Sequence, residues 1–102
     1  MAKIEVVNMK YYRTHWKQNN SEFPTWIFSE VGKDRLDTRR LEIFNNGSAK
    51  YFDCRTPFEI GVSQYPENID EFNDGGELFI KEITLEEFEE ALSHYDLEGI
   101  RL

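Results

Sequence analysis

Few side chains in this sequence are of the kinds that most often bind metals or act as nucleophiles. There is one cysteine, Cys54, and there are two histidines, His15 and His94. Glu90 precedes His94 by four residues, a spacing that places both on one helix face and supplies two possible metal ligands. A closed site needs more ligands, and no Cys-x-x-Cys pair lies nearby. We therefore expect no metal site, and we interpret His94 as a favourable contact with a helix C-terminus.

Catalytic groups are equally hard to find. No helix N-terminus or nucleophile elbow follows Cys54, so we expect a buried or half-buried cysteine on a strand. Carboxylates are numerous, but a glycosidase needs two across a cleft, for which a chain this small has little room. The runs NDGG and NNGS lack the strand, helix and lysine of a phosphate loop. We expect neither catalytic residues nor a cofactor, and thus no enzyme.

Acidic residues are the most distinctive feature, and they are unevenly distributed. The net charge of the 102-residue chain is −8 at pH 7. Residues 1–65 have a net charge of +2, whereas residues 66–102 have a net charge of −10. The second part would repel a phosphate backbone, so we expect no nucleic-acid partner. It suits a basic protein better, although acidity that only aids solubility is the plainer interpretation.

The stretch 84–95 is predicted to be a helix with a well-formed start. Thr84 fits the N-cap, and Glu87 three residues later completes a capping box. Ile83 and Phe88 occupy the hydrophobic staple positions. Apolar residues recur at helical spacing and predict a face that packs on a sheet: Leu85, Phe88, Leu92 and Tyr95. We expect Gly99 to end this region.

The segments before residue 54 alternate in the manner of strands. Strands are predicted over 10–17 and 25–31, followed by a turn at 32–34. Asn46-Gly47 predicts a hairpin within 37–54. A three-residue loop over 45–47 pairs apolar with apolar and plus with minus, and is therefore preferred to a two-residue loop. The preferred register places Leu41 opposite Tyr51, Ile43 opposite Ala49, Glu42 opposite Lys50 and Arg39 opposite Asp53.

The pattern is weaker after Cys54. The segment 58–65 is either an edge strand or an extended loop. One helical turn is expected within 67–76, and 78–83 is either a last strand or an extended approach to the helix. The prediction is an α+β fold over a single domain, residues 1–102, with an antiparallel sheet of about four to five strands and a C-terminal helix on one face.

The run from Trp26 to Tyr51 resembles a family of small bacterial proteins described as a domain of unknown function. The resemblance extends in outline over residues 10–92, and the family's end resembles Ile83 and the acidic helix that follows it. The family usually has Glu at the position of Asp37. The matching positions are Ser29-Glu30, Asp34-Arg35, Asp37 with Arg39-Arg40, Glu42-Ile43-Phe44, Gly47, Tyr51 and the run Glu86-Glu87-Phe88-Glu89.

The resemblance brings no established activity, but small acidic proteins of this type often accompany bacterial toxins as immunity proteins. We therefore expect a cytoplasmic immunity protein that neutralises a toxin domain, such as a basic nuclease, through an acidic surface. The absence of a signal peptide and of an apolar span agrees with a cytoplasmic protein that has no membrane partner. The expected contact residues are Asp70, Glu71, Asp74, Glu86, Glu87, Glu89 and Glu90, with Tyr65 and Phe72 as aromatic anchors.

The alternative is an accessory or regulatory domain that binds another protein through its sheet. Trp16 and Trp26, with the adjacent Arg39 and Arg40, are of the residue types enriched in interface hot spots. In that case the glutamates of the helix serve only solubility.

Overall fold

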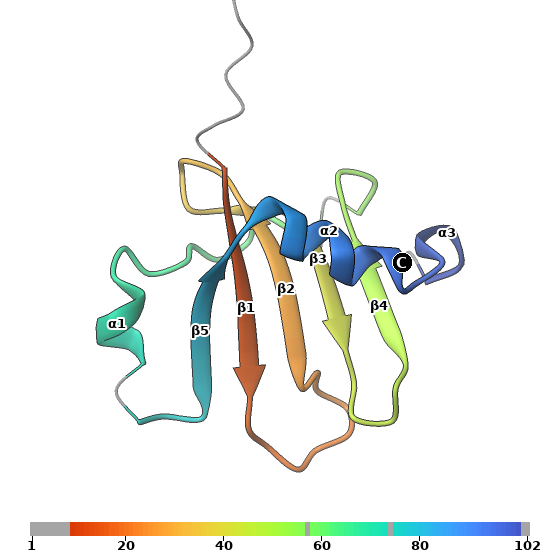
Figure 1. Cartoon of the computed structure of the whole chain (residues 1–102), viewed down its shortest axis with the longest axis horizontal. Coiled ribbons are helices and arrows are strands. Elements are labelled where there is room, and N and C mark those ends of the chain that lie inside the picture. The colour runs from red at the N-terminus through yellow and green to blue at the C-terminus, as the bar shows by residue number, and fades with distance from the viewer. Residues whose placement is uncertain (1–8, 57, 74, 101–102) are drawn as a thin grey trace, which may run out of the picture.

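Five antiparallel strands form one sheet in the order β4-β3-β2-β1-β5 (Figure 1). The computed structural model describes residues 9–56, 58–73 and 75–100. The predicted α+β class with a C-terminal helix on one face is confirmed. The strands are β1 (Lys10–Trp16), β2 (Trp26–Val31), β3 (Asp37–Ile43), β4 (Ala49–Phe52) and β5 (Leu78–Ile83), and the helices are α1 (Ile69–Phe72), α2 (Leu85–Ser93) and α3 (Leu97–Ile100).

The β3–β4 hairpin has the predicted register. Leu41 faces Tyr51 and Ile43 faces Ala49. The Phe44 N–H donates to the Ser48 carbonyl at 2.9 Å and closes a three-residue loop. Gly47 in that loop has a φ of 89°, a conformation that glycine adopts without a steric penalty.

The expected register places Arg39 opposite Asp53, but the ion pair that Arg39 forms is with a neighbouring strand. The Arg39 guanidinium binds Glu30 of β2 at 2.7 Å, on the opposite side of β3 from Asp53. The Asp53 carboxylate instead binds Arg55, two residues later in the turn that leaves β4. Cys54 lies in the same turn and is exposed, so the prediction of a buried or half-buried strand cysteine is wrong.

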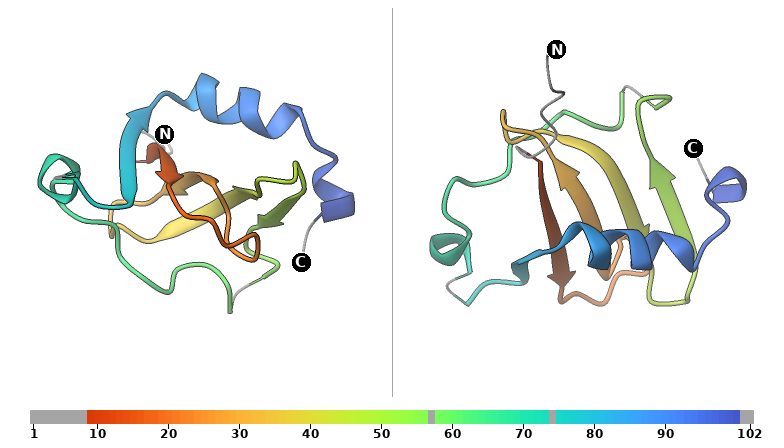
Figure 2. Two further views of the ribbon diagram at one scale, coloured as in Figure 1. Left: turned by 90° about the horizontal axis from the view of Figure 1, so that it is seen from below. Right: turned by 45° about the horizontal axis from the view of Figure 1, so that its top comes forward.

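The two faces of the sheet are covered by different parts of the chain. Viewed along the sheet, α2 lies on one side and the segment between β4 and α1 lies on the other (Figure 2). Under α2, Leu41, Tyr51, Phe88 and Leu92 form a buried core. On the opposite face, a smaller core of three residues packs against Tyr65 and Ile69: Tyr12, Val31 and Ile80. The segment 58–65, for which a strand or a loop was expected, is therefore a loop that covers this face.

Helix α2 begins as predicted. The Glu87 N–H donates to Thr84 Oγ1 at 3.1 Å, and the Thr84 N–H donates to Glu87 Oε1 at 2.9 Å. Phe88 is fully buried, which fixes the helix against the sheet. Gly99 does not end the region, because it lies inside α3. Of the helices in the described ranges, none is long and apolar enough to cross a membrane.

Candidate functional site

Helix α2 runs across the strands near one end of the sheet and does not cover the other end of that face (Figure 1). Near the start of β1, the ring of Tyr11 contacts Phe88 with centroids 5.2 Å apart. Further along β1, Arg13 and His15 project from the same face, because alternate residues of a strand point the same way. The uncovered part is thus formed by the second half of β1 and the adjoining ends of β2 and β5.

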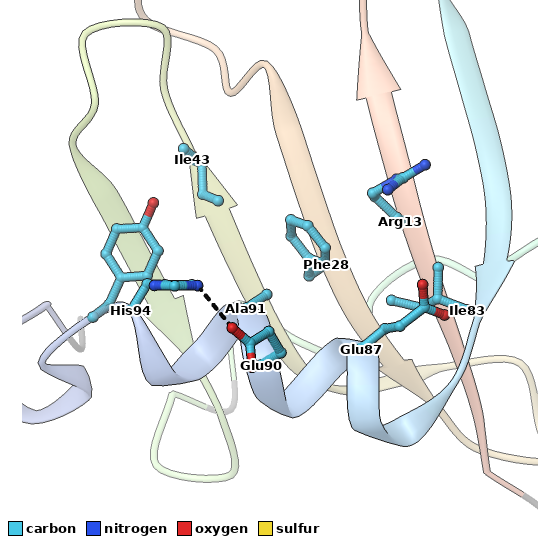
Figure 3. A pocket seen from close by; sticks show the side chains of 9 residues that line it. Arg13, Phe28, Ile43, Ile83, Glu87, Glu90, Ala91 and His94 are labelled. Atoms are coloured by element: carbon cyan, nitrogen blue, oxygen red, sulfur yellow. Dashed lines mark ion pairs between the residues drawn. The ribbon is translucent and has the colours of Figure 1, made fainter.

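A groove of about 360 Å³ runs between α2 and this uncovered part (Figure 3). Its apolar lining includes Phe28, Ile43 and Ile83 from three different strands. Arg13 lies on the sheet side, and Glu87, Glu90 and His94 project from the helix side. An apolar floor between charged rims is the usual arrangement of a protein-binding surface.

The four glutamates of α2 differ in their surroundings. The hydrogen bond from the Thr84 backbone N–H is the main cause that lowers the pKa of Glu87, and the charges of Lys81 and Arg13 lower it further. Glu90 pairs with His94 at 3.2 Å when that histidine is protonated. Glu86 and Glu89 are exposed, and no cation of the described residues lies within ion-pairing distance of either.

The structure separates the other predicted contact residues from α2. Asp70, Glu71 and Phe72 lie on α1, beside β5 at the edge of the sheet (Figure 1). Phe72 is 39% exposed there. Asp74 lies outside the described residues. The expected acidic surface is therefore divided between α2 and the α1 edge.

Tyr65 does not lie among the glutamates of α2. It lies on the opposite face of the sheet, where its ring stacks on Tyr12 with centroids 5.2 Å apart. Its hydroxyl shares a 2.6 Å hydrogen bond with that of Ser29, which is fully buried. Burial is the main cause that raises the pKa of the Tyr65 hydroxyl. Tyr65 thus holds the covering loop against the sheet.

Several residues of the family-like run from Trp26 to Tyr51 also maintain the fold. Glu30 accepts two hydrogen bonds from Arg39, at 3.0 and 2.7 Å, and one from Tyr11. Burial raises the pKa of Glu30, but these bonds, one from Thr38 and the charge of Arg39 outweigh it, so the pKa lies below its ordinary value. Arg39 also lies 5.0 Å from the centre of the Phe88 ring, so this network supports α2.

Arg40 stabilises the opposite face of the sheet, where it joins β3 to the covering loop. It pairs with Asp37 and with Glu42, and it donates to the Glu59 carbonyl in the covering loop at 2.7 Å. The other Asp37 oxygen accepts from the Gly61 N–H at 2.7 Å. Both arginines of the expected aromatic–arginine patch are therefore engaged within the fold.

Sequence reasoning missed a second feature of the uncovered face. Phe79, His15 and Trp26 lie directly opposite one another on β5, β1 and β2. Three cations, Arg13, Lys17 and Lys81, line the same shallow hollow. The alternation of β1 does place Arg13 and His15 on one face, but no local signal indicates that β5 lies beside β1.

Among residues 9–56, 58–73 and 75–100, no three His, Cys, Asp or Glu side chains are grouped so that they could hold a metal ion.

No curated protein and no solved structure matches the chain. A family model described as Domain of unknown function (DUF6881) matches residues 10–96. Since this match spans most of the 102 residues, the chain belongs to the DUF6881 family.

Proposed function

We propose that the protein is a cytoplasmic immunity protein that binds and neutralises a cognate bacterial toxin domain with a basic surface, such as a nuclease. The observation that carries the proposal is the position of Glu86 and Glu89. Both carboxylates are exposed, lack an ion pair with the described residues, and belong to the helix that borders an apolar groove.

The mechanism combines the two parts of this surface. The α2 glutamates attract the toxin's basic surface and accelerate its association, an effect that salt weakens. An apolar side chain of the toxin then enters the groove beside Phe28 and Ile43 and provides the contact that keeps the complex together. The toxin's nucleic-acid-binding surface is covered, so its substrate no longer enters. Asp70, Glu71 and Phe72 on α1 form a separate outer contact.

A charge variant tests this mechanism without disturbing the helix start. The triple change Glu86→Gln, Glu89→Gln, Glu90→Gln removes three charges and retains Glu87, which the capping box requires. The probe is the inactive form of a toxin domain encoded beside the gene, and stopped-flow mixing gives the association rate. We expect that rate to fall by at least about tenfold at low salt.

A matched control removes three exposed carboxylates far from α2: Glu22→Gln, Glu59→Gln, Glu67→Gln. Because both triple variants change the net charge equally, only a local role for α2 separates them. Association that is as fast for the α2 variant as for the control contradicts the acidic-face mechanism. Loss of binding after Ile43→Asp, with binding retained after Ile27→Asp on the opposite face, supports the groove as the anchor site.

One observation favours the accessory or regulatory protein-interaction domain as a second candidate. Phe58 and Val62 in the loop opposite α2 are 91% and 71% exposed, and they line a hollow of about 410 Å³. Exposed apolar side chains that cluster in this way are typical of binding sites. A partner that is lost after Phe58→Ala but retained by the α2 triple variant would favour this function over toxin neutralisation.

A further inference from the structure

Three aromatic side chains form a row across the uncovered end of the sheet. His15 lies opposite Trp26 in the β1–β2 pair and opposite Phe79 in the β1–β5 pair. The rings of His15 and Trp26 are stacked, with centroids 4.3 Å apart and planes 13° apart. Phe79 is 56% exposed at the end of the row. An edge strand that exposes a phenylalanine beside two stacked rings offers planar apolar surface to a ligand.

Cations border this aromatic row on both sides. Arg13 and Lys81 lie opposite each other, two residues along β1 and β5 from the His15–Phe79 pair. The Arg13 guanidinium carbon is 5.4 Å from the centre of the Trp26 ring. Lys17 follows β1 at the other side of the row, and all three cations line a hollow of about 260 Å³. None of them forms an ion pair with another described residue, although Arg13 and Lys81 interact electrostatically with Glu87 at the border.

We propose that this aromatic row binds unpaired nucleotides of a single-stranded nucleic acid. The bases stack on Phe79 and on the His15–Trp26 pair, while the phosphates lie against Arg13, Lys17 and Lys81. Sheet surfaces that combine exposed rings with cations recognise single strands in this way, because every base has a π face and every linkage has a negative charge. A peptide of acidic residues alone, such as polyglutamate, would satisfy the cations but offers no rings to the aromatic row.

The overall acidity limits the length of such a ligand but does not exclude it. Salt at physiological concentration screens the potential of each charge over about 8 Å. The nearby cations therefore determine the potential over the hollow. The glutamates of α2 then repel any longer stretch of strand. The expectation of no nucleic-acid partner rests on residues 66–102, whereas four of the six residues here come from β1, β2 and the residue after β1. This proposal is independent of toxin binding.

Tryptophan fluorescence gives a direct test. The chain has two tryptophans, so Trp16→Phe leaves Trp26 as the single reporter. Unlabelled RNA and DNA single strands of about six nucleotides, within the range of single-strand site sizes, serve as the probes. We expect quenching of Trp26, with a Kd that rises about twentyfold between about 50 and about 200 mM salt if three phosphates are contacted. A duplex of the same sequence should bind at least about tenfold more weakly, since its base faces are covered.

Matched variants locate the contact. Phe79→Ala should weaken binding by about 5- to 150-fold, the loss expected for one base–aromatic stack. Phe79→Leu keeps an apolar side chain without the ring and should lose binding similarly, which separates stacking from folding. Lys81→Gln and Lys17→Gln should weaken binding and reduce its salt dependence. Phe58→Ala and Lys33→Gln make the same exchanges elsewhere on the exposed surface and should leave Kd unchanged.

Some results would overturn the proposal that this surface binds a single strand. Absence of quenching at low salt overturns the proposal, as does binding that survives both Phe79→Leu and Lys81→Gln. Equal competition by a polyglutamate peptide overturns it too, because the surface would then select negative charge alone. Equal competition by nucleoside monophosphates also contradicts the proposal, because a monophosphate supplies one base and one phosphate, whereas a strand engages several of each.

Discussion

The side-chain amide of Asn73 forms two hydrogen bonds with the backbone of Ile80. The Ile80 N–H donates to Asn73 Oδ1 at 2.8 Å, and Asn73 Nδ2 donates to the Ile80 carbonyl at 2.5 Å. Ile80 lies in the middle of β5, which is an edge strand of the sheet. The amide therefore occupies the place that a further strand would take, and it blocks pairing of this edge with another chain.

Asn73→Ala should lower the free energy of unfolding by about 1–3 kcal/mol, because it leaves both backbone groups of Ile80 without their partner. It should also increase aggregation at high protein concentration, since the edge becomes available. Urea denaturation and light scattering measure the two effects. Asn45→Ala, in the exposed hairpin loop, is the control and should change neither. Equal stability and solubility of the two variants would contradict a protective role for Asn73.

The Glu30–Arg39 pair should give a pH dependence at acid pH. The pKa of Glu30 in the folded protein lies below its ordinary value of 4.5. The pair therefore contributes stability that is fully present above pH 4.5 and is lost as the pH falls through the lower folded value.

Glu30→Gln should cost about 1.5–3 kcal/mol at neutral pH, since hydrogen bonds to a charged group are removed. Its unfolding free energy should also change less than that of the native protein as the pH falls below 4.5. Chemical denaturation at a series of pH values measures both effects. The exposed Glu59→Gln is the control, and parallel curves for the native protein and Glu30→Gln would rule out this contribution.

The buried Ser29 and Tyr65 hydroxyls should stabilise the fold as a pair. Tyr65→Phe leaves the fully buried Ser29 hydroxyl without this partner and should cost about 1–2 kcal/mol. Adding Ser29→Ala should cost less than the two single losses combined, because the unsatisfied hydroxyl is also removed. Urea unfolding of the four proteins gives this difference. Strict additivity of the single changes would show that the hydroxyls do not act together.

Tyr65 should also give a pH dependence at alkaline pH. Burial raises the pKa of its hydroxyl above the ordinary value of 10.0. Stability from the neutral phenol is then fully present below pH 10.0 and is lost as the pH rises through the folded value. Tyr65→Phe should therefore reduce the alkaline destabilisation seen by denaturation. An unchanged alkaline profile would place its origin at other groups.

Two substitutions in the capping box of α2 should lower stability by different amounts. Thr84→Ala removes the acceptor of the Glu87 N–H and should lower stability by about 1 kcal/mol. Glu87→Gln retains an oxygen for the Thr84 N–H and should cost less. Circular dichroism melting compares them, with Ser93→Ala at the far end of α2 as a reference. A larger loss for Glu87→Gln than for Thr84→Ala would contradict this assignment.

What the sequence predicted correctly was mostly local. The β3–β4 register follows from Asn46-Gly47 and from side chains only a few residues apart, and the start of α2 follows from Thr84 and Glu87 alone. The partners of Arg39 and Tyr65 could not be predicted in this way. Glu30 and Ser29 reach them across strands or across a long loop, and no local pattern selects one of many carboxylates or hydroxyls.

The acidic surface shows the same limit. Counting charge identified residues 66–102 correctly as acidic, but it could not separate the α1 edge from α2. The aromatic row could not be predicted from the sequence for a related reason. Phe79 lies beside His15 only because β5 pairs with β1. Cys54 was misplaced because the four-residue β4 ends before it, and the strand pattern of the sequence does not reveal that end.

The strand order has a consequence for how the chain folds during synthesis. Strands β1 to β4 are consecutive neighbours, so this meander can form as soon as they leave the ribosome. β5 pairs with β1 across more than sixty intervening residues. Until it emerges, β1 remains an open edge and the apolar face lacks α2. The nascent chain therefore has a vulnerable interval that ends only after β5 and α2 have emerged, and the closure of the sheet is then nonlocal and slow.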